Sequence, residues 1–208
     1  MVIQAPRPGR PKSPEKRAAI REAAVELFMS EGLQRTSMDA IAAAAGVSKQ
    51  TVYSHFDSKD ALFRECVCGK VEDYGLHAGD IPDHLPLDQA LKIFGRQFLD
   101  LLQDEEVLSM FRLLAGECAV YPAIARVFFE AGPDETRRSV ALLLGRFSDR
   151  GEIELTDPLE SASLLIALFQ GRYFLELLLG VRDGIDEREV DIHLDRSVER
   201  FVSLHRRT

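Results

Sequence analysis

The segment from Ser37 to Phe56, SMDAIAAAAGVSKQTVYSHF, constrains the fold most, because two short helical patterns meet at one glycine. Thr36 is expected to be the N-cap of the first helix, and Asp39 places a carboxylate near the positive end of that helix. The alanine run keeps this helix thin enough for close packing. Gly46 ends it, since glycine tolerates the left-handed conformation of a helix C-terminus. The segment therefore predicts a helical hairpin.

The second helix of this hairpin is expected over residues 49–55, with Ser48 as its N-cap. Val52 and Phe56 lie four residues apart and are predicted to face the core. Groups suited to phosphates and base edges cover the remaining surface: Lys49, Gln50, Thr51, Tyr53, Ser54 and His55. The pattern is typical of a helix that enters the major groove of DNA. An ordinary helical hairpin that never meets DNA is the alternative.

The flanking sequence distinguishes these two interpretations. IREAAVELFMSEGLQRTSMDAIAAAAGVSKQTVYSHFDSKDALF contains the pattern A-A-x-x-L-F-x-x-x-G, the A-G-V-S turn and the ending Y-x-H-F-x-S-K. On these motifs, residues 17–63 resemble the DNA-binding domain of the TetR family of one-component transcriptional regulators. The resemblance implies that Lys59 contacts phosphate at the start of a fourth helix. With Thr36, the candidate DNA-binding residues are therefore Thr36, Ser48, Lys49, Gln50, Thr51, Tyr53, Ser54, His55 and Lys59.

Charge divides the chain unevenly. The whole sequence has 208 residues and a net charge of −8, but residues 1–60 carry 9 basic and 7 acidic side chains, whereas residues 61–208 carry 17 and 27. A basic head on an acidic body would orient the protein on a polyanion; a solvated acidic surface is the simpler interpretation. We expect a DNA-binding domain over residues 1–60, with a flexible basic arm over residues 1–12, and a helical regulatory and dimerisation domain over residues 61–208.

Helix follows helix along the chain, which predicts an all-α fold. Ser13 and Pro14 start the first helix as N-cap and N1, Gly32 ends it, and Asp57 or Ser58 caps the fourth. In the body, helices are predicted over residues 87–103, 105–118, 121–131, 133–150, 158–181 and 187–205.

Residues 162–181, ASLLIALFQGRYFLELLLGV, are apolar nearly all round. A membrane span is disfavoured because Arg172 and Glu176 would be charged in lipid. Burial between the protein's own core and a second copy of the chain explains the pattern better, and the family resemblance assigns the last two long helices to a dimer interface. The residues expected there are Val140, Leu143, Leu144, Phe147, Leu164, Leu168, Leu175 and Leu179. A homodimer would place two reading helices about 34–36 Å apart on a palindromic double-stranded operator.

Residues 111–133, FRLLAGECAVYPAIARVFFEAGP, resemble the C-terminal domain of AefR-like TetR regulators. The resemblance implies a small-molecule cavity among the body helices, for a hydrophobic or amphipathic effector. The candidate ligand-binding residues are Phe94, Phe98, Phe111, Arg112, Glu117, Phe128, Gln170, Arg172 and Tyr173. The alternatives are core packing for each aromatic ring, paired or solvated side chains for Arg112 and Glu117, and an i, i+4 ion pair between Arg172 and Glu176.

Enzyme motifs are missing from the sequence: there is no G-x-S-x-G, P-loop, H-E-x-x-H or C-x-x-C, and the five histidines are scattered. We therefore expect neither catalysis nor a cofactor or metal. Three unpaired cysteines and no signal-peptide core indicate the cytoplasm. The function predicted is that of a ligand-responsive, homodimeric transcriptional repressor. The alternatives are a helical protein-interaction module and a regulator without a small-molecule effector.

Overall fold

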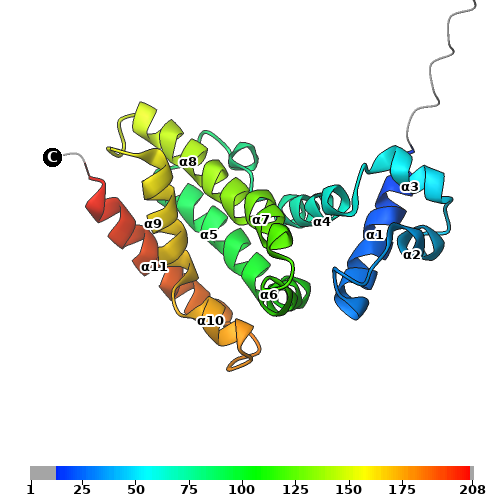
Figure 1. Ribbon diagram of the computed structural model, residues 1–208. Coiled ribbons are helices and arrows are strands. Elements are labelled where there is room, and N and C mark those ends of the chain that lie inside the picture. The colour runs from blue at the N-terminus through cyan, green and yellow to red at the C-terminus, as the bar shows by residue number, and fades with distance from the viewer. Residues whose placement is uncertain (1–12, 207–208) are drawn as a thin grey trace, which may run out of the picture. The chain divides into compact units, whose positions relative to one another are not determined.

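The computed structural model describes residues 13–206, and every regular element among them is helical (Figure 1). The all-α prediction is confirmed for this part of the chain. The predicted basic arm, residues 1–12, lies outside the described residues. The chain divides into two compact units, an N-terminal unit ending at Cys66 and a C-terminal unit starting at Val67. This division falls inside α4 (Lys59–Asp73), six residues after the boundary expected from the sequence.

The N-terminal unit contains α1 (Pro14–Glu31), α2 (Met38–Ala44), α3 (Lys49–His55) and the first half of α4. Ser13 caps α1, because its hydroxyl accepts a hydrogen bond from the backbone N–H of Lys16 at 3.3 Å. Fully buried apolar residues hold the helices together, and the rings of Phe28 and Phe63 meet edge to face with centroids 5.7 Å apart. The short helices α2 and α3 thus pack on an apolar core to which α1 and α4 contribute.

The C-terminal unit continues from α4 through a short 3-10 helix, η1 (Ala78–Asp80), and seven α-helices. These are α5 (Leu87–Gln103), α6 (Glu105–Glu117), α7 (Pro122–Ala131), α8 (Pro133–Asp149), α9 (Pro158–Gln170), α10 (Tyr173–Leu178) and α11 (Glu187–Leu204). Figure 1 shows α9 and α11 running side by side, and α8 packs against α9.

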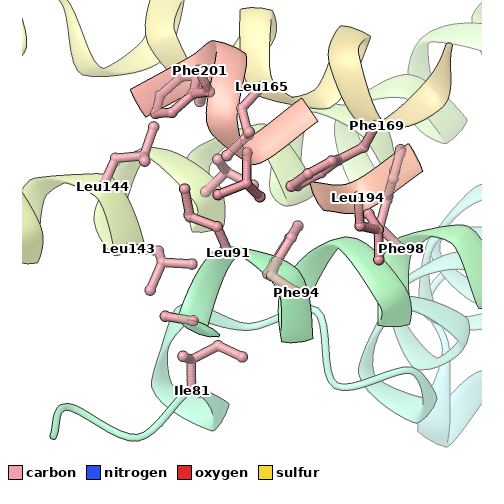
Figure 2. Packing of buried hydrophobic residues seen from close by; sticks show 14 of the residues in the cluster. Ile81, Leu91, Phe94, Phe98, Leu143, Leu144, Leu165, Phe169, Leu194 and Phe201 are labelled. Atoms are coloured by element: carbon pink, nitrogen blue, oxygen red, sulfur yellow. The ribbon is translucent and has the colours of Figure 1, made fainter. Parts of the chain in front are cut away.

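Helices α5, α8, α9 and α11 enclose the core of the C-terminal unit (Figure 2). Phe94 from α5 and Phe169 from α9 are fully buried there, as is Phe201 from α11. Gly95 permits the close approach of α5 and α11, since a Cβ atom at this position would lie 2.6 Å from Cδ2 of Leu194. A larger residue would force these two helices apart.

The long helix predicted over residues 158–181 is interrupted at Gly171, so that part of the prediction is wrong. Gly171 has φ 48° and ψ −140°, a conformation that essentially only glycine adopts, and it separates α9 from α10. A Cβ atom there would also lie 3.0 Å from Cε1 of His193 on α11. Between residues 13 and 206, no helix combines the length and the hydropathy needed to cross a membrane.

Candidate nucleic-acid interface

The start of α2 differs from the sequence prediction by one residue. Ser37, not Thr36, is the N-cap, and its hydroxyl accepts a hydrogen bond from the N–H of Ala40 at 3.1 Å. The Thr36 hydroxyl instead donates to the carbonyl oxygens of Leu27 and Gly32, and the residue is only 1% exposed. Thr36 therefore braces the end of α1 from inside, and its predicted contact with DNA is wrong because no surface is left to make it.

The turn between α2 and α3 has the geometry expected from its glycine and serine. Gly46 has φ 64°, and the N–H of Val47 donates to the carbonyl of Ala42 at 3.0 Å. Ser48 caps α3, since its Oγ accepts from the N–H of Thr51 at 3.1 Å and lies 2.8 Å from Thr51 Oγ1. Because Ser48 and Thr51 bind each other, they fix the N-terminus of the helix.

The outer face of α3 is polar and accessible. Lys49, Gln50, Tyr53 and Ser54 are all exposed, whereas Val52 is buried against the rest of the unit. The Lys49 ammonium lies 6.0 Å from the centroid of the Tyr53 ring, so the cation and the aromatic side chain are neighbours on this face. A cation, an amide and two hydroxyl groups are the donors and acceptors that contact phosphates and base edges.

His55 does not share this face. It lies on the buried side of α3, only 9% exposed, with its ring centroid 6.2 Å from that of Phe56. The phosphate contact predicted for His55 is wrong for this conformation, because the imidazole packs inward. Helical spacing contained this signal, since His55 follows the buried Val52 by three positions.

Lys59 is also engaged inside the unit. Its ammonium donates to three backbone carbonyl oxygens, at 2.5 Å to Leu33, 3.0 Å to Thr36 and 3.2 Å to Gln34. A lysine has three N–H donors, and all three are used here. In this geometry Lys59 connects the α1–α2 turn to the start of α4, and its phosphate contact stays a prediction.

Arg17 is a residue that the sequence analysis missed. From α1 it reaches Glu65 on α4 with Nε 2.8 Å from Oε1, and its guanidinium carbon stands 4.7 Å from the centroid of the Phe56 ring. No local pattern reveals this contact, because Glu65 is 48 residues away in the sequence.

In the C-terminal unit, the predicted ligand-binding residues separate into groups. Phe94 and Phe98 are buried in the core around α5, where neighbouring side chains fill the space (Figure 2). Phe111 and Phe128 instead join α6 to α7 with ring centroids 5.0 Å apart, and Phe174 on α10 lies 4.8 Å from Phe111. We call Phe111, Phe128 and Phe174 the aromatic group; the sequence analysis included the first two among the candidates.

Arg112 fastens α6 to the end of α10. Its Nε donates to the carbonyl of Leu178 at 2.9 Å and its Nη2 to that of Leu177 at 3.1 Å, while Nη1 pairs with Glu105 at 2.7 Å. Arg112 is therefore paired, as one of the alternatives had it, and its partner is Glu105. Glu117 has a buried Oε2 atom without a hydrogen-bond partner among the described residues. A buried acceptor without a hydrogen-bond partner carries a desolvation cost.

The remaining candidates lie at the break between α9 and α10. Gln170 is the last residue of α9, and the exposed Arg172 pairs with Glu176 at 3.4 Å, the i, i+4 alternative. Tyr173 is buried against His193 on α11, with ring centroids 4.7 Å apart. Arg172 is therefore part of an ion pair, and Tyr173 is part of a ring contact.

The predicted dimer residues fall into two classes. Those on α8 are wrong as interface residues, because the protein's own core buries them: Val140, Leu143, Leu144 and Phe147. Leu168 is half-buried, also against the core. Three others are exposed: Leu164 (38%), Leu175 (59%) and Leu179 (68%).

Comparisons with known proteins match both units. Residues 20–66 match the family of bacterial regulatory proteins named tetR, and residues 89–206 match the C-terminal domain of AefR-like transcriptional repressors. The HTH-type transcriptional regulator TtgR of Pseudomonas putida is 27% identical over 193 residues, which cover 87% of this chain and 90% of that protein.

Solved structures give the same result. The flavonoid-responsive regulator FrrA is 32% identical, with a TM-score of 0.77 over 93% of this chain and 98% of FrrA. A TetR-family regulator from Mesorhizobium loti MAFF303099 is 29% identical, with a TM-score of 0.76 over 94% of this chain and all of the other. The domain matches, these relatives and the helix-turn-helix geometry together show that the chain belongs to the TetR family of bacterial DNA-binding transcriptional regulators, with an AefR-like C-terminal domain.

Proposed function

We propose that this protein is a cytoplasmic, ligand-responsive repressor that binds a palindromic operator as a homodimer and leaves it when a small molecule enters the C-terminal unit. The observation that carries the DNA-binding part is the exposed polar face of α3, presented beside a turn with a left-handed glycine. We propose Lys49, Gln50, Tyr53 and Ser54 as its DNA contacts, with Ser48 and Thr51 at the N-terminus of the helix.

Dimerisation is supported by exposed leucines on α9, on α10 and at the C-cap of α10. Leu164, Leu175 and Leu179 offer apolar surface that a monomer would leave in water. A second copy of the chain would cover it. Because α3 has only seven residues and reads few base pairs, two copies also give the operator its length and its symmetry.

We propose that the effector of the C-terminal unit is aromatic and carries hydroxyl groups. Phe111, Phe128 and Phe174 supply ring edges and faces from three helices, and the free Oε2 of Glu117 on α6 would accept a hydrogen bond from a ligand hydroxyl. FrrA, whose fold and sequence are similar, responds to flavonoids, which are molecules of this chemistry. We propose the same class for this protein, with Arg112 holding α10 in place at the aromatic group.

Selection of bound duplexes from a random DNA pool tests the proposal. We expect an enriched inverted repeat whose half-sites are centred about one helical turn apart. Failure to enrich any sequence would refute operator binding, and a single asymmetric site would refute the symmetric dimer. A panel of flavonoids and simpler phenols, titrated against the complex with the selected duplex, tests release; no effect from any of them would refute the proposed effector class.

A further inference from the structure

Arg17 makes three contacts with two other helices of the N-terminal unit, α4 and the end of α3. Its Nε donates to Glu65 on α4 at 2.8 Å, its Nη1 lies 3.5 Å from the carbonyl oxygen of His55, and its guanidinium carbon stands 4.7 Å from the centroid of the Phe56 ring. His55 is the last residue of α3 and Phe56 is its C-cap. One side chain of α1 thus connects the end of the proposed reading helix to α4.

The chemistry of this contact depends on a planar guanidinium. Arginine offers a flat face to an aromatic ring while its edge donates hydrogen bonds in fixed directions. The positive charge lies at the C-terminal end of α3, where it also complements the helix dipole. The hydrogen bond from Arg17 lowers the pKa of Glu65, so Glu65 is ionised at neutral pH and orients the guanidinium.

We propose that Arg17 and Glu65 are positioning residues that set the angle at which α3 enters the DNA groove. This inference rests on the proposed DNA-reading role of α3 and assigns neither residue a contact with DNA. The pair is partly exposed, with side-chain exposures of 41% and 33%, so water screens it and it contributes little to folding stability. Its effect lies in the orientation of α3.

An alternative explanation is that Arg17 contacts a phosphate directly. A variant of Glu65 distinguishes the two explanations. Removing a negative charge from a DNA-binding domain strengthens DNA binding if the charge acts only through the overall field. If Glu65 positions Arg17 and thereby α3, removing its charge weakens operator binding instead. The two explanations thus predict opposite signs for Glu65→Gln.

The experiment measures the affinity of Glu65→Gln for the duplex that the wild-type protein selects from a random pool, and for a scrambled duplex of equal length. We expect operator affinity to fall by about tenfold or more, the size of one lost base contact, while affinity for the scrambled duplex stays the same or rises. Glu22→Gln, which removes a charge from the exposed face of α1, is the matched control and should not weaken operator binding.

Arg17→Lys is the second variant and stands in if Glu65→Gln does not fold. It keeps the charge but loses the planar group, so we expect a similar loss of operator affinity and an unchanged salt dependence. Loss of a phosphate contact would instead lower the slope of log affinity against log salt concentration by about one. The double variant should lose no more than either single variant, since both act through one contact. Wild-type operator affinity in either variant, or additive losses, would overturn the inference. A wild-type protein that selects no duplex would instead refute the proposed function.

Discussion

The ammonium of Lys49 lies 2.8 Å from a carboxylate oxygen of Asp39, which joins the first turn of α3 to the first turn of α2. Both side chains are largely exposed, and their hydrogen bond raises the pKa of Lys49. In the free protein, Lys49 on the proposed reading face is therefore already paired with an anion, the Asp39 carboxylate. If Lys49 contacts a phosphate, as we propose, the DNA competes with this carboxylate.

Replacing Asp39 by asparagine should strengthen binding to every duplex, because Lys49 is released and a negative charge is removed from the interface. We expect a gain of a few-fold in fluorescence anisotropy titrations, similar for the selected operator and a scrambled duplex. Lys49→Ala should weaken binding to both duplexes and lower the slope of log affinity against log salt concentration by about one. Glu26→Gln, on the exposed side of α1, is the charge-matched control. An unchanged or lower affinity for Asp39→Asn would contradict this competition.

The exposed side chains of Gln50 and Tyr53 are the proposed sequence readers. The combined variant Gln50→Ala/Tyr53→Ala should lose about 1–3 kcal/mol of operator binding for each base contact removed. Affinity for a scrambled duplex should change little, since phosphate contacts supply most non-specific binding. Thermal melting should be nearly unchanged, because Tyr53 is 45% exposed. Equal losses on both duplexes would show that these side chains do not read sequence.

The sequence predicted the elements whose signals are local. The caps at Ser13 and Ser48 and the turn at Gly46 each depend on atoms within about four residues, so spacing alone locates them. Neighbouring residues alone do not determine whether Thr36 or Ser37 is the N-cap. Both carry a hydroxyl, and only the packing of the turn against α1 buries Thr36 and leaves Ser37 at the helix start.

Periodicity also could not tell which neighbour covers an apolar face. Leu143 and Leu144 have the spacing of a buried stripe, but that spacing does not show whether the same chain or a second copy provides the cover. The structure shows that α5, α9 and α11 of the same chain enclose the core to which both leucines belong. The contacts of Arg17 with α3 and α4 were equally hidden, since they join residues far apart in the sequence.

The break between α9 and α10 gives a stability test. Gly171→Ala should destabilise the protein by about 1–3 kcal/mol, because alanine is strained in this conformation and its Cβ would press on His193. Gly116→Ala is the matched control inside α6, where a Cβ would meet nothing within 4 Å. It should stabilise by about 0.5–1 kcal/mol. Chemical denaturation measures both, and equal effects would refute the strain argument.

The exposed leucine of α10 tests the proposed dimer. Leu175→Glu places a charge in the proposed interface and should shift the protein toward monomer, with loss of operator binding, because burying an unpaired charge costs several kcal/mol. Sedimentation equilibrium measures the shift. Val120→Glu, at an even more exposed position between α6 and α7, is the control and should leave the association state unchanged. A fully dimeric Leu175→Glu would place the interface elsewhere.

Asp104 links three helices and predicts a pH-dependent stability. One of its carboxylate oxygens caps α6, and the other accepts from Tyr74 at 2.7 Å and pairs with Lys70 on α4 at 2.9 Å. Burial alone would raise the pKa of Asp104, but the hydrogen bonds from Tyr74 and Lys70 lead a set of opposing contacts that lower it overall. Burial and the Asp104 hydrogen bond raise the pKa of Tyr74 to about 12, so Tyr74 stays protonated and donates.

A carboxyl group whose pKa is lower in the folded than in the unfolded protein stabilises the fold above its unfolded value, and this stabilisation is lost as the pH falls. Asp104→Asn keeps a good helix cap but removes the charge, so it should cost about 1–3 kcal/mol at pH 7, measured by urea denaturation. The difference from wild type should shrink as the pH falls below the ordinary Asp value of 3.8, since the wild-type carboxylate is then protonated too. Asp88→Asn, in the exposed first turn of α5, should show a much smaller difference at pH 7. If the cost of Asp104→Asn were the same at pH 3 and pH 7, the charge of Asp104 would not be what holds α4 to the start of α6.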